Sequence, residues 1–441
     1  MEKHGEYIES LNGLRDFIDN SPSCYHVIDN VKKMLDANDF TQCYEHESWN
    51  LKPGKNYYVV RSDSSIIAFK IPTGDIKNYQ IIASHSDSPC FKIKEKSSLT
   101  KDDKYVCLNV EKYGGMILSA WFDRPLSIAG RVVIDRDNVI STKLVDIDRD
   151  LVMIPNLAIH MDRNVNDGHK YQVQKEIAPI WSGNPNGDGL EDVVAKAINV
   201  EKEAIIGKDL FLYNRNATSV WGANNEYISG RKLDDLMCAY ASVKAIVDSA
   251  NANSVSICAI FDNEEVGSGS RQGADSDFLS MCIDRIASAN GLTSEQKYVA
   301  LAASFMVSAD NAHAAHPNYL EKSDPKNKVY MNEGVVIKHS ANQKYTTDSV
   351  SAALFRKICS LAGVPTQEYV NNSDVVGGST LGNIASTHVS INTVDVGLAQ
   401  LAMHSPYETA GVKDAEYMIK AFKKYYSTLI AKNSQNEYEL R

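Results

Sequence analysis

The spacing of hydrophobic and polar residues divides the chain into three regions. In the first of them, apolar side chains recur at helical spacing over 8–18 and 27–34, which predicts two amphipathic helices. Strand-like apolar runs follow at 56–62, 65–71 and 79–89. We therefore expect the opening region to contribute two helices and three strands.

The second region, from 91 to 230, contains short β-rich runs separated by Gly, Pro, Asp and Asn, residues that favour turns. One pair of runs predicts a hairpin that turns at 135–138, and LVMIPNLAIH at 151–160 also has β character. We predict that 91–230 is an inserted β-rich domain. The segments 1–90 and 231–441 would then form one discontinuous domain around it.

In the third region, helical and strand patterns alternate. DDLMCAYASVKAIVDSA at 234–250 predicts an amphipathic helix. The runs at 254–261, 298–310, 335–340 and 389–397 are too continuously apolar for half-exposed strands. Continuous apolar strands between helices predict a central sheet that is covered on both faces. The predicted fold class is α/β, an α/β/α sandwich with the β-rich insertion.

Composition limits the environment and the partners of the protein. An apolar fraction of 43% is typical of a soluble globular chain, and a net charge of -10 argues against nucleic acid as a partner. No run approaches about 20 apolar residues, so no membrane-spanning helix is predicted. The start lacks the apolar region of a signal peptide, and the eight cysteines form no CxxC pair. We expect reduced thiols and a cytoplasmic protein.

Residues that can bind metals follow four of the predicted strands. Ligand sites in open α/β sheets lie beyond the carboxyl ends of the strands. We therefore expect these side chains to meet at one edge of the sheet. They are His85 with Asp87, Glu264 with Glu265, Asp310 followed by His313 and His316, and His404.

Each of these signals has an ordinary structural explanation when it is taken alone. The histidine at 85 can be bonded within a turn, adjacent glutamates can begin a helix, and Asp310 can cap one. The loop VGSGSRQG after Glu265 also resembles a dinucleotide loop, but Gln272 replaces the last glycine of that motif. Two carboxylates before the loop would repel a pyrophosphate. The joint occurrence at four strand ends favours a metal site.

A two-metal hydrolytic site also explains why two glutamates are adjacent. Imidazoles and carboxylates bind zinc and similar ions, and a carboxylate can bridge two of them. Neighbouring residues point in different directions, so one glutamate can bind a metal while the other moves a proton. Asp234 and Asp235 precede a predicted helix, and one of them is a candidate bridge. Ordinary N-capping is the alternative.

The sequence closely resembles the M18 metallopeptidase family, the aspartyl aminopeptidase type. The resemblance implies a zinc-peptidase (phosphorylase/hydrolase-like) fold with an inserted β-rich dimerisation domain. The matching segments run nearly end to end, in the expected order. They are SPSCYH, ASHSDSPCFKIK, YGGMILSAWFDRPLSIAGRVV, IPNLAIHMDR, GRKLDDL, FDNEEVGSGSRQGADS, SADNAHAAHPNY, NEGVVIKHSANQKY and TVDVGLAQLAMHS.

The resemblance implies two divalent metal ions per subunit, with Zn²⁺ as the expected metal. Asp87 would hydrogen-bond the far nitrogen of His85, and Glu264 would be the general base toward the water that bridges the ions. The implied ligands are His85 and Asp310 for one ion, Glu265 and His404 for the other, and Asp234 as the bridge between them.

The implied reaction is removal of N-terminal residues from peptides that have a free N-terminus, with Asp and Glu as candidate preferences. Lys338 and Tyr345 would contact substrate, and His313 would shape the site or stabilise the assembly. His160 matches a family histidine that reaches a neighbouring active site, although a structural loop histidine is the alternative. The family also implies a homo-oligomer, a dodecamer built from dimers.

Two departures from the family pattern leave the substrate specificity open. RPL follows WFD where an RDL-like run is usual, and SDVVGGSTLG at 373–382 replaces a D-x-P-x-G-S-T run. One alternative function is a related metal-dependent amidase or deacylase with the same two-metal machinery. Another is a non-catalytic assembly protein on the same fold, although every ligand and base position is filled.

Overall fold

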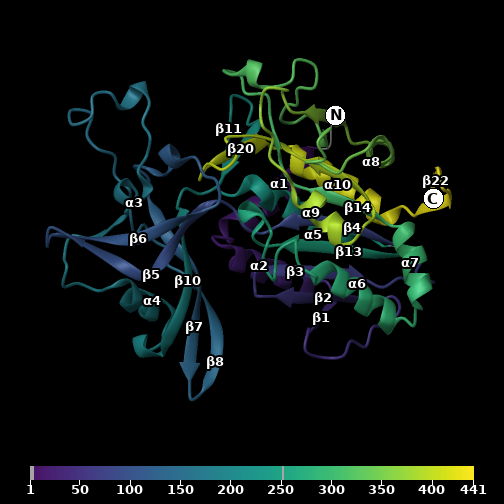
Figure 1. Cartoon of the computed structure of the whole chain (residues 1–441), viewed down its shortest axis with the longest axis horizontal. Coiled ribbons are helices and arrows are strands. Elements are labelled where there is room, and N and C mark those ends of the chain that lie inside the picture. Colours follow the sequence, from purple (N-terminus) through teal and green to yellow (C-terminus); the bar gives the residue numbers. More distant parts are fainter. Residues whose placement is uncertain (1–3, 251–252) are drawn as a thin grey trace.

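The computed structural model of the protein describes residues 4–250 and 253–441. Figure 1 shows a larger lobe around a nine-stranded sheet and a smaller lobe around a six-stranded sheet. A five-stranded sheet lies where the lobes meet, and a two-stranded hairpin, β21 (Ile430–Ser434) with β22 (Glu437–Leu440), lies near the C-terminus.

The nine-stranded sheet has four parallel strands at its centre. Strands β13, β4, β14 and β18 are neighbours, and Phe261 at the end of β13 pairs with His85 at the end of β4. Every residue of β4 and β13 is buried, as their continuous apolar runs predicted. In sheet order the strands are β1 (Phe40–Cys43), β2 (Asn56–Arg61), β3 (Ser65–Lys70), β13 (Ser254–Phe261), β4 (Asn78–His85), β14 (Phe305–Ala309), β18 (Asn392–Gly397), β16 (Val335–His339) and β17 (Thr366–Val370).

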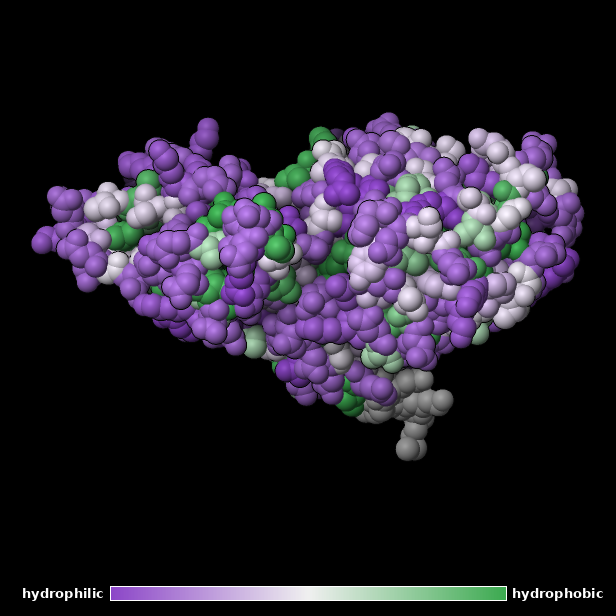
Figure 2. Space-filling model, turned by 90° about the horizontal axis from the view of Figure 1, so that it is seen from below, coloured by the Kyte–Doolittle hydropathy of each residue, from purple (hydrophilic) through white to green (hydrophobic). Residues whose placement is uncertain are grey.

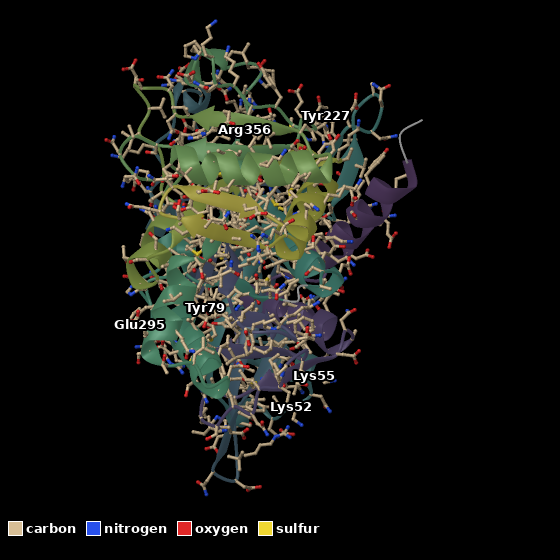
Figure 3. The ribbon with its side chains drawn as sticks, turned by 90° about the vertical axis from the view of Figure 1, so that its right-hand side faces the viewer. Lys52, Lys55, Tyr79, Tyr227, Glu295 and Arg356 are labelled. Carbon is tan, nitrogen blue, oxygen red and sulfur yellow. The ribbon has the colours of Figure 1, made fainter. Side chains whose placement is uncertain are left out.

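Helices cover both faces of this sheet, which confirms the predicted α/β/α sandwich. Alternate residues of a strand point to opposite faces, and Ile82 belongs to one core while Ile81 belongs to the other. In Figure 3, Tyr79 of β4 lies inside the molecule and Glu295 of α7 lies at its edge. One face carries α1 (His4–Asp19), α2 (Cys24–Asp36), α5 (Leu233–Asp248), α8 (Ser349–Ala362) and α10 (Asp414–Ser427); the other carries α6 (Phe278–Ala289), α7 (Ser294–Ala302) and α9 (Leu381–His388).

The six-stranded sheet has a separate hydrophobic core, to which α4 (Leu190–Ile198) contributes. Its β7–β8 hairpin turns at the predicted place, because β7 ends at Arg136 and β8 begins at Val139. In sheet order the strands are β8 (Val139–Asp146), β7 (Leu126–Arg136), β10 (Ile205–Asn214), β5 (Cys90–Lys101), β6 (Tyr105–Tyr113) and β9 (Ile180–Ser182).

The five-stranded sheet joins segments that are far apart in sequence. Strands β11 and β12 lie at the end of the 91–230 range. They pair with each other, and β12 also pairs with β20. The division into two domains and the dimerising role of the insertion stay predictions. In sheet order the strands are β11 (Ser219–Trp221), β12 (Tyr227–Gly230), β20 (Glu408–Gly411), β19 (Ala399–Leu401) and β15 (Ala312–His313). Short helical turns are η1 (Leu118–Trp121), η2 (Val165–Asp167), α3 (Val173–Glu176), η3 (Lys202–Ala204), η4 (Glu264–Val266) and η5 (Leu320–Lys322).

One expected strand is half right, because the second half of 298–310 does form β14, and a second expected strand is wrong. The first half of 298–310 is helix α7, which begins with a capping box: Thr293 and Gln296 each accept the other's backbone amide. The run at 151–160 forms only isolated bridges, through Val152 and Met153. Pro155 follows after one further residue and has no amide to donate to a strand ladder.

The surface and the thiols agree with the composition. Figure 2 shows hydrophilic side chains over most of one face of both lobes, with a hollow between the lobes. All eight cysteines are free. Among the described residues, none of the helices combines the length and the apolar character that crossing a membrane requires.

Candidate metal centre

The predicted meeting of strand ends occurs at the carboxyl edge of the central parallel strands. His85 ends β4, Glu264 and Glu265 form the turn after β13, and Asp310 follows β14. Strand β18 passes close to this edge, because a Cβ at Gly397 would lie 2.0 Å from the carbonyl oxygen of Asp310. Only glycine permits that approach.

Two further residues reach the edge from the five-stranded sheet. Asp234 lies in the first turn of α5, a few residues after β12, and is 3% exposed. His404 lies in the turn between β19 and β20, with a φ of 67°. The parallel strands and the five-stranded sheet therefore build the site together.

The candidate ligands form three overlapping groups, in each of which the ligand atoms lie within 4.8 Å of one another. His404 Nε2 lies 3.2 Å from Glu265 Oε2 and 3.5 Å from Asp234 Oδ2. On the other side, His85 Nε2 lies 3.8 Å from Asp234 Oδ1. The groups are His85, Asp234, Asp235 and Asp310; Asp234, Glu265 and His404; and His85, Glu264 and Glu265.

The charges in this cluster are those of a cation site. Burial and neighbouring carboxylates raise the pKa values of Asp235, Glu265 and Asp310. Within the described structure, Asp234 Oδ1, Asp235 Oδ1 and Glu265 Oε1 are buried without a hydrogen-bond partner. Carboxylates that stay ionised when buried need a cation to compensate their charge. Imidazole nitrogens and carboxylate oxygens together suit zinc or a similar ion, so the residues fit the metal that the sequence predicts.

Histidine and carboxylate also stabilise each other's charged forms. Burial alone would lower the pKa of His404. Its hydrogen bond to Asp234 outweighs burial and raises the pKa from 6.5 to about 9. Burial raises the pKa of Asp234, but His404 and His85 lower it below its usual value. Asp234 is therefore the carboxylate of this cluster that the two imidazoles keep ionised.

Asp87 organises the turn that carries the two glutamates. Its carboxylate accepts hydrogen bonds from the backbone amides of Glu264 (3.1 Å) and Glu265 (3.2 Å) and from the hydroxyl of Tyr113 (2.6 Å). His85 Nδ1 lies 3.4 Å from Asp87 Oδ1, but the main-chain oxygen of Asp87 is nearer, at 3.1 Å. The sequence predicts only that Asp87 orients His85. In the structure the Asp87 carboxylate also holds the turn that carries Glu264 and Glu265.

Glu408 holds two candidate ligands through their backbones. Its carboxylate accepts hydrogen bonds from the amides of Asp234 (3.0 Å) and His404 (2.7 Å). The far nitrogen of His404, Nδ1, lies 2.6 Å from the carbonyl oxygen of Gly115. These contacts fix the position of Asp234 and the orientation of the His404 ring.

The predicted substrate residues lie at different distances from the cluster. Lys338 Nζ lies 3.6 Å from Asp310 Oδ1, donates to the carbonyl oxygen of Asn311 and stands 5.2 Å from the centre of the Tyr345 ring. Burial lowers the pKa of Lys338, but Asp310 and its neighbours raise it above its usual value. Lys338 therefore supplies a buried positive charge beside a candidate ligand.

Two predicted histidines stand outside the metal groups found among the described residues. His313 is exposed at the end of β15, with its ring 6.4 Å from that of Tyr369. His160 is exposed in the loop that precedes η2 in the smaller lobe. The structure of one chain therefore does not bring His160 to the cluster.

Three residues of the site were missed by sequence reasoning. Asp235 was noticed only as one half of an Asp-Asp pair, yet its carboxylate belongs to the His85 group. Tyr113 lies in a matched segment but had no assigned role. Glu408 has no signal in the sequence, since nothing in its neighbourhood shows that it would accept two distant amides.

A buried cluster of imidazoles and carboxylates at the edge of an α/β/α sheet defines a metal-binding protein of the zinc-peptidase type. The family model described as aminopeptidase I zinc metalloprotease (M18) matches residues 17–426. The chain therefore belongs to the M18 family, and the resemblance noted in its sequence is confirmed.

Known relatives match nearly the whole chain. A probable M18 family aminopeptidase 2 of Clostridium acetobutylicum is 45% identical over 429 residues, 95% of this chain and 99% of the relative. Among solved structures, Ape4 in its complex with Nbr1 has a TM-score of 0.92 at 34% identity, covering 97% of this chain and 87% of the other. The S. cerevisiae mApe1 dodecamer has a TM-score of 0.84 at 26% identity, covering 94% and 96%.

Proposed function

We propose that the protein is a dinuclear metallo-aminopeptidase that hydrolyses N-terminal residues from peptides with a free N-terminus. The observation that carries this proposal is the position of Asp234, which belongs to two ligand groups on opposite sides of its carboxylate. Membership of the M18 family and the names of the relatives support the same activity.

The proposed ligands follow the two groups that share Asp234. His85 and Asp310 would hold one ion, and Glu265 and His404 would hold the other, with Asp234 between them. Zinc is the expected metal, because the donors are imidazole and carboxylate and the family is one of zinc metalloproteases. When bound, the ions supply polarisation of the scissile carbonyl and activation of water.

Glu264 is the proposed general base. It belongs to the group of His85 and Glu265, and burial raises the pKa of its carboxyl, which moves it toward the range where a carboxylate can both take up and release a proton. Glu264 takes the proton of the attacking water and returns it to the leaving amine. Asp87 keeps the Glu264 backbone in place during both transfers.

The proposed substrate contacts are Lys338, Tyr345 and His313. Lys338 belongs to β16, Tyr345 lies in the loop after β16, and His313 ends β15. A buried ammonium at Lys338 favours binding of a carboxylate, which agrees with acidic N-terminal residues as candidate substrates. His160 would act in the site of a neighbouring subunit. A homo-oligomer, a dodecamer built from dimers, is proposed because the mApe1 neighbour is a dodecamer. The proposed location is the cytoplasm, as expected from the sequence.

Matched pairs of substrates test the activity and separate it from that of an amidase or deacylase. Aminoacyl and peptidyl substrates with a free N-terminus, across acidic, neutral and apolar residues, are compared with their N-acetylated counterparts in the presence of zinc, cobalt or manganese. We expect hydrolysis of the free substrates and its loss on chelation. Equal cleavage of a blocked substrate would exclude an aminopeptidase, and no turnover with bound metal would favour an assembly protein.

A further inference from the structure

A short segment of the smaller lobe, residues 113–117, runs from the end of β6 into the metal centre. Tyr113 is the last residue of β6, and its hydroxyl donates to Asp87. Two residues on, the carbonyl oxygen of Gly115 faces His404 Nδ1, and the amide of Ile117 donates to the main-chain oxygen of His404 at 3.1 Å. The 113–117 segment thus contacts the site at both of its ends.

The Tyr113 hydroxyl belongs to a chain of hydrogen bonds that ends at the backbone amide of Glu264, the proposed base. Asn263 Nδ2 donates to this hydroxyl at 2.8 Å, and the hydroxyl donates to Asp87 Oδ2 at 2.6 Å. Asp87 in turn accepts the amides of Glu264 and Glu265. A carboxylate held by three donors has a fixed orientation, and so does the turn that it holds.

Gly114 lies directly against a proposed ligand. Its φ is 76°, and a Cβ built on it would lie 3.2 Å from Glu265 Cβ, 3.3 Å from the Glu265 carbonyl oxygen and 3.4 Å from Pro89 Cβ. A side chain at position 114 would therefore push on Glu265 in addition to straining the backbone.

We propose that Tyr113 is a positioning residue for Glu264 and that Gly114 and Gly115 position the ligands Glu265 and His404. The 113–117 segment of the smaller lobe thereby positions the proposed base and two proposed ligands of its own chain. This proposal rests on the proposed function for its kinetic consequences, whereas its consequences for metal binding do not depend on turnover. The two halves of the 113–117 segment have different roles, so their variants differ in phenotype.

The first test removes one oxygen atom. Tyr113→Phe keeps the ring against Phe211, whose ring centroid is 5.9 Å away. It removes the hydrogen bond that the hydroxyl donates to Asp87 Oδ2. We expect kcat to fall about 10- to 100-fold because the base loses its alignment, with KM within about twofold of the wild-type value and zinc content and melting temperature unchanged. Tyr105→Phe is the matched control, because Tyr105 is exposed at the other end of β6.

The second test adds one methyl group. Gly114→Ala should lower zinc affinity at least about 10-fold, measured by competition with a chromogenic chelator, because Glu265 is displaced. Gly168→Ala is the matched control: Gly168 also has a positive φ, 119°, but a Cβ there would have nothing within 4 Å. The control therefore carries the backbone strain of the substitution without the contact.

The outcomes separate this proposal from the proposed function. A wild-type protein that binds zinc but hydrolyses no aminoacyl substrate would overturn the proposed function, while the difference in zinc affinity between Gly114→Ala and Gly168→Ala would still support the positioning of Glu265. With an active wild type, Tyr113→Phe must lose kcat without losing stability. Unchanged kcat, or a loss matched by loss of folded protein, would overturn the positioning role of Tyr113.

Discussion

The carboxylate of Glu408 accepts a hydrogen bond from the backbone amide of His404 at 2.7 Å, across the turn that carries the His404 ring. Its other oxygen accepts the buried amide of Asp234. Glu408→Ala would leave both amides without this acceptor and would free two ligands. A buried unsatisfied donor lowers the free energy of unfolding by about 1–3 kcal/mol. We expect lower stability in urea and weaker zinc binding.

Glu408→Gln is the control for this prediction, because it keeps one acceptor oxygen and the shape of the side chain. Its losses of stability and zinc affinity should be smaller than those of Glu408→Ala. Equal zinc affinity in the alanine variant and the wild type would contradict the role given to Glu408.

Exchange of the proposed base should separate catalysis from metal binding. Glu264→Gln removes the proton carrier while Asp87 still accepts the backbone amide of residue 264. We expect kcat to fall at least about 100-fold with zinc content unchanged, measured by steady-state kinetics and metal analysis. Glu295→Gln, at the exposed start of α7, should have wild-type kinetics. Normal turnover of Glu264→Gln would assign the base to another group.

Removal of metal should destabilise the protein. The carboxylates around His85 and His404 repel one another when they are buried and ionised. A ligand that binds only the folded state raises the free energy of unfolding by about 2.7 kcal/mol when its free concentration is 100 times its Kd. We expect a chelator to lower the melting temperature and added zinc to restore it. Identical melting curves with zinc and with chelator would show that the cluster binds no zinc.

Asp395, in β18, connects the loop after β16 with the start of α9. Its carboxylate accepts hydrogen bonds of 2.6 Å from the amide and hydroxyl of Thr346 and from the hydroxyl of Thr380. Thr346 follows Tyr345, a proposed substrate contact. We expect Asp395→Ala to raise KM about 10-fold, with a smaller change in kcat, because substrate binding would first have to order the loop.

The control for Asp395 is Thr387→Ala on the exposed side of α9, whose hydroxyl bonds only within its own helix. An unchanged KM in Asp395→Ala would mean that the loop after β16 plays no part in binding the substrates tested. A parallel fall in kcat and zinc content would instead place Asp395 among residues that support the metal centre.

A buried carboxylate away from the metal centre should make stability depend on pH. Burial raises the pKa of Asp414 from 3.8 to about 7, although the amides of Asn332 and Gly334 oppose this shift. The folded state therefore holds the proton more tightly. This contribution to stability is complete below about pH 4 and is lost as the pH rises through about 7.

Asp414→Asn cannot ionise, so its stability relative to the wild type should increase by at least about 1 kcal/mol between about pH 5 and about pH 8. Urea unfolding at the two pH values measures the change. Asp75→Asn, at an exposed carboxylate, should show no such change. A difference between Asp414→Asn and the wild type that stays constant with pH would contradict the raised pKa.

The part of the site that sequence patterns could predict is the part built by strand ends. Continuous apolar runs identify β4, β13 and β14, and parallel neighbours bring their carboxyl ends together. His85, Glu264 and Asp310 could therefore be placed at one edge before any coordinates. The helix at 294–302 is harder to predict, because its apolar residues run on into those of β14 and only the Thr293 capping box signals where the helix begins.

The rest of the site depends on contacts that leave no local pattern. Tyr113 reaches Asp87 across 26 residues and Glu408 reaches Asp234 across 174, so neither role follows from neighbouring sequence. His160 has a further limit, because its proposed partner belongs to another copy of the chain. Contacts of this kind are set by packing between distant segments, which hydrophobic spacing does not specify.

The wide spread of the metal centre along the chain also has a consequence for biosynthesis. Its residues begin at His85, but His404, in the turn before β20, and Glu408, the first residue of β20, lie near the C-terminal end of the chain and are made late by the ribosome. A nascent chain can pair β4 with β13 long before it can complete the centre. A peptide-cleaving activity would therefore be withheld from the growing polypeptides nearby until translation of this chain is almost finished.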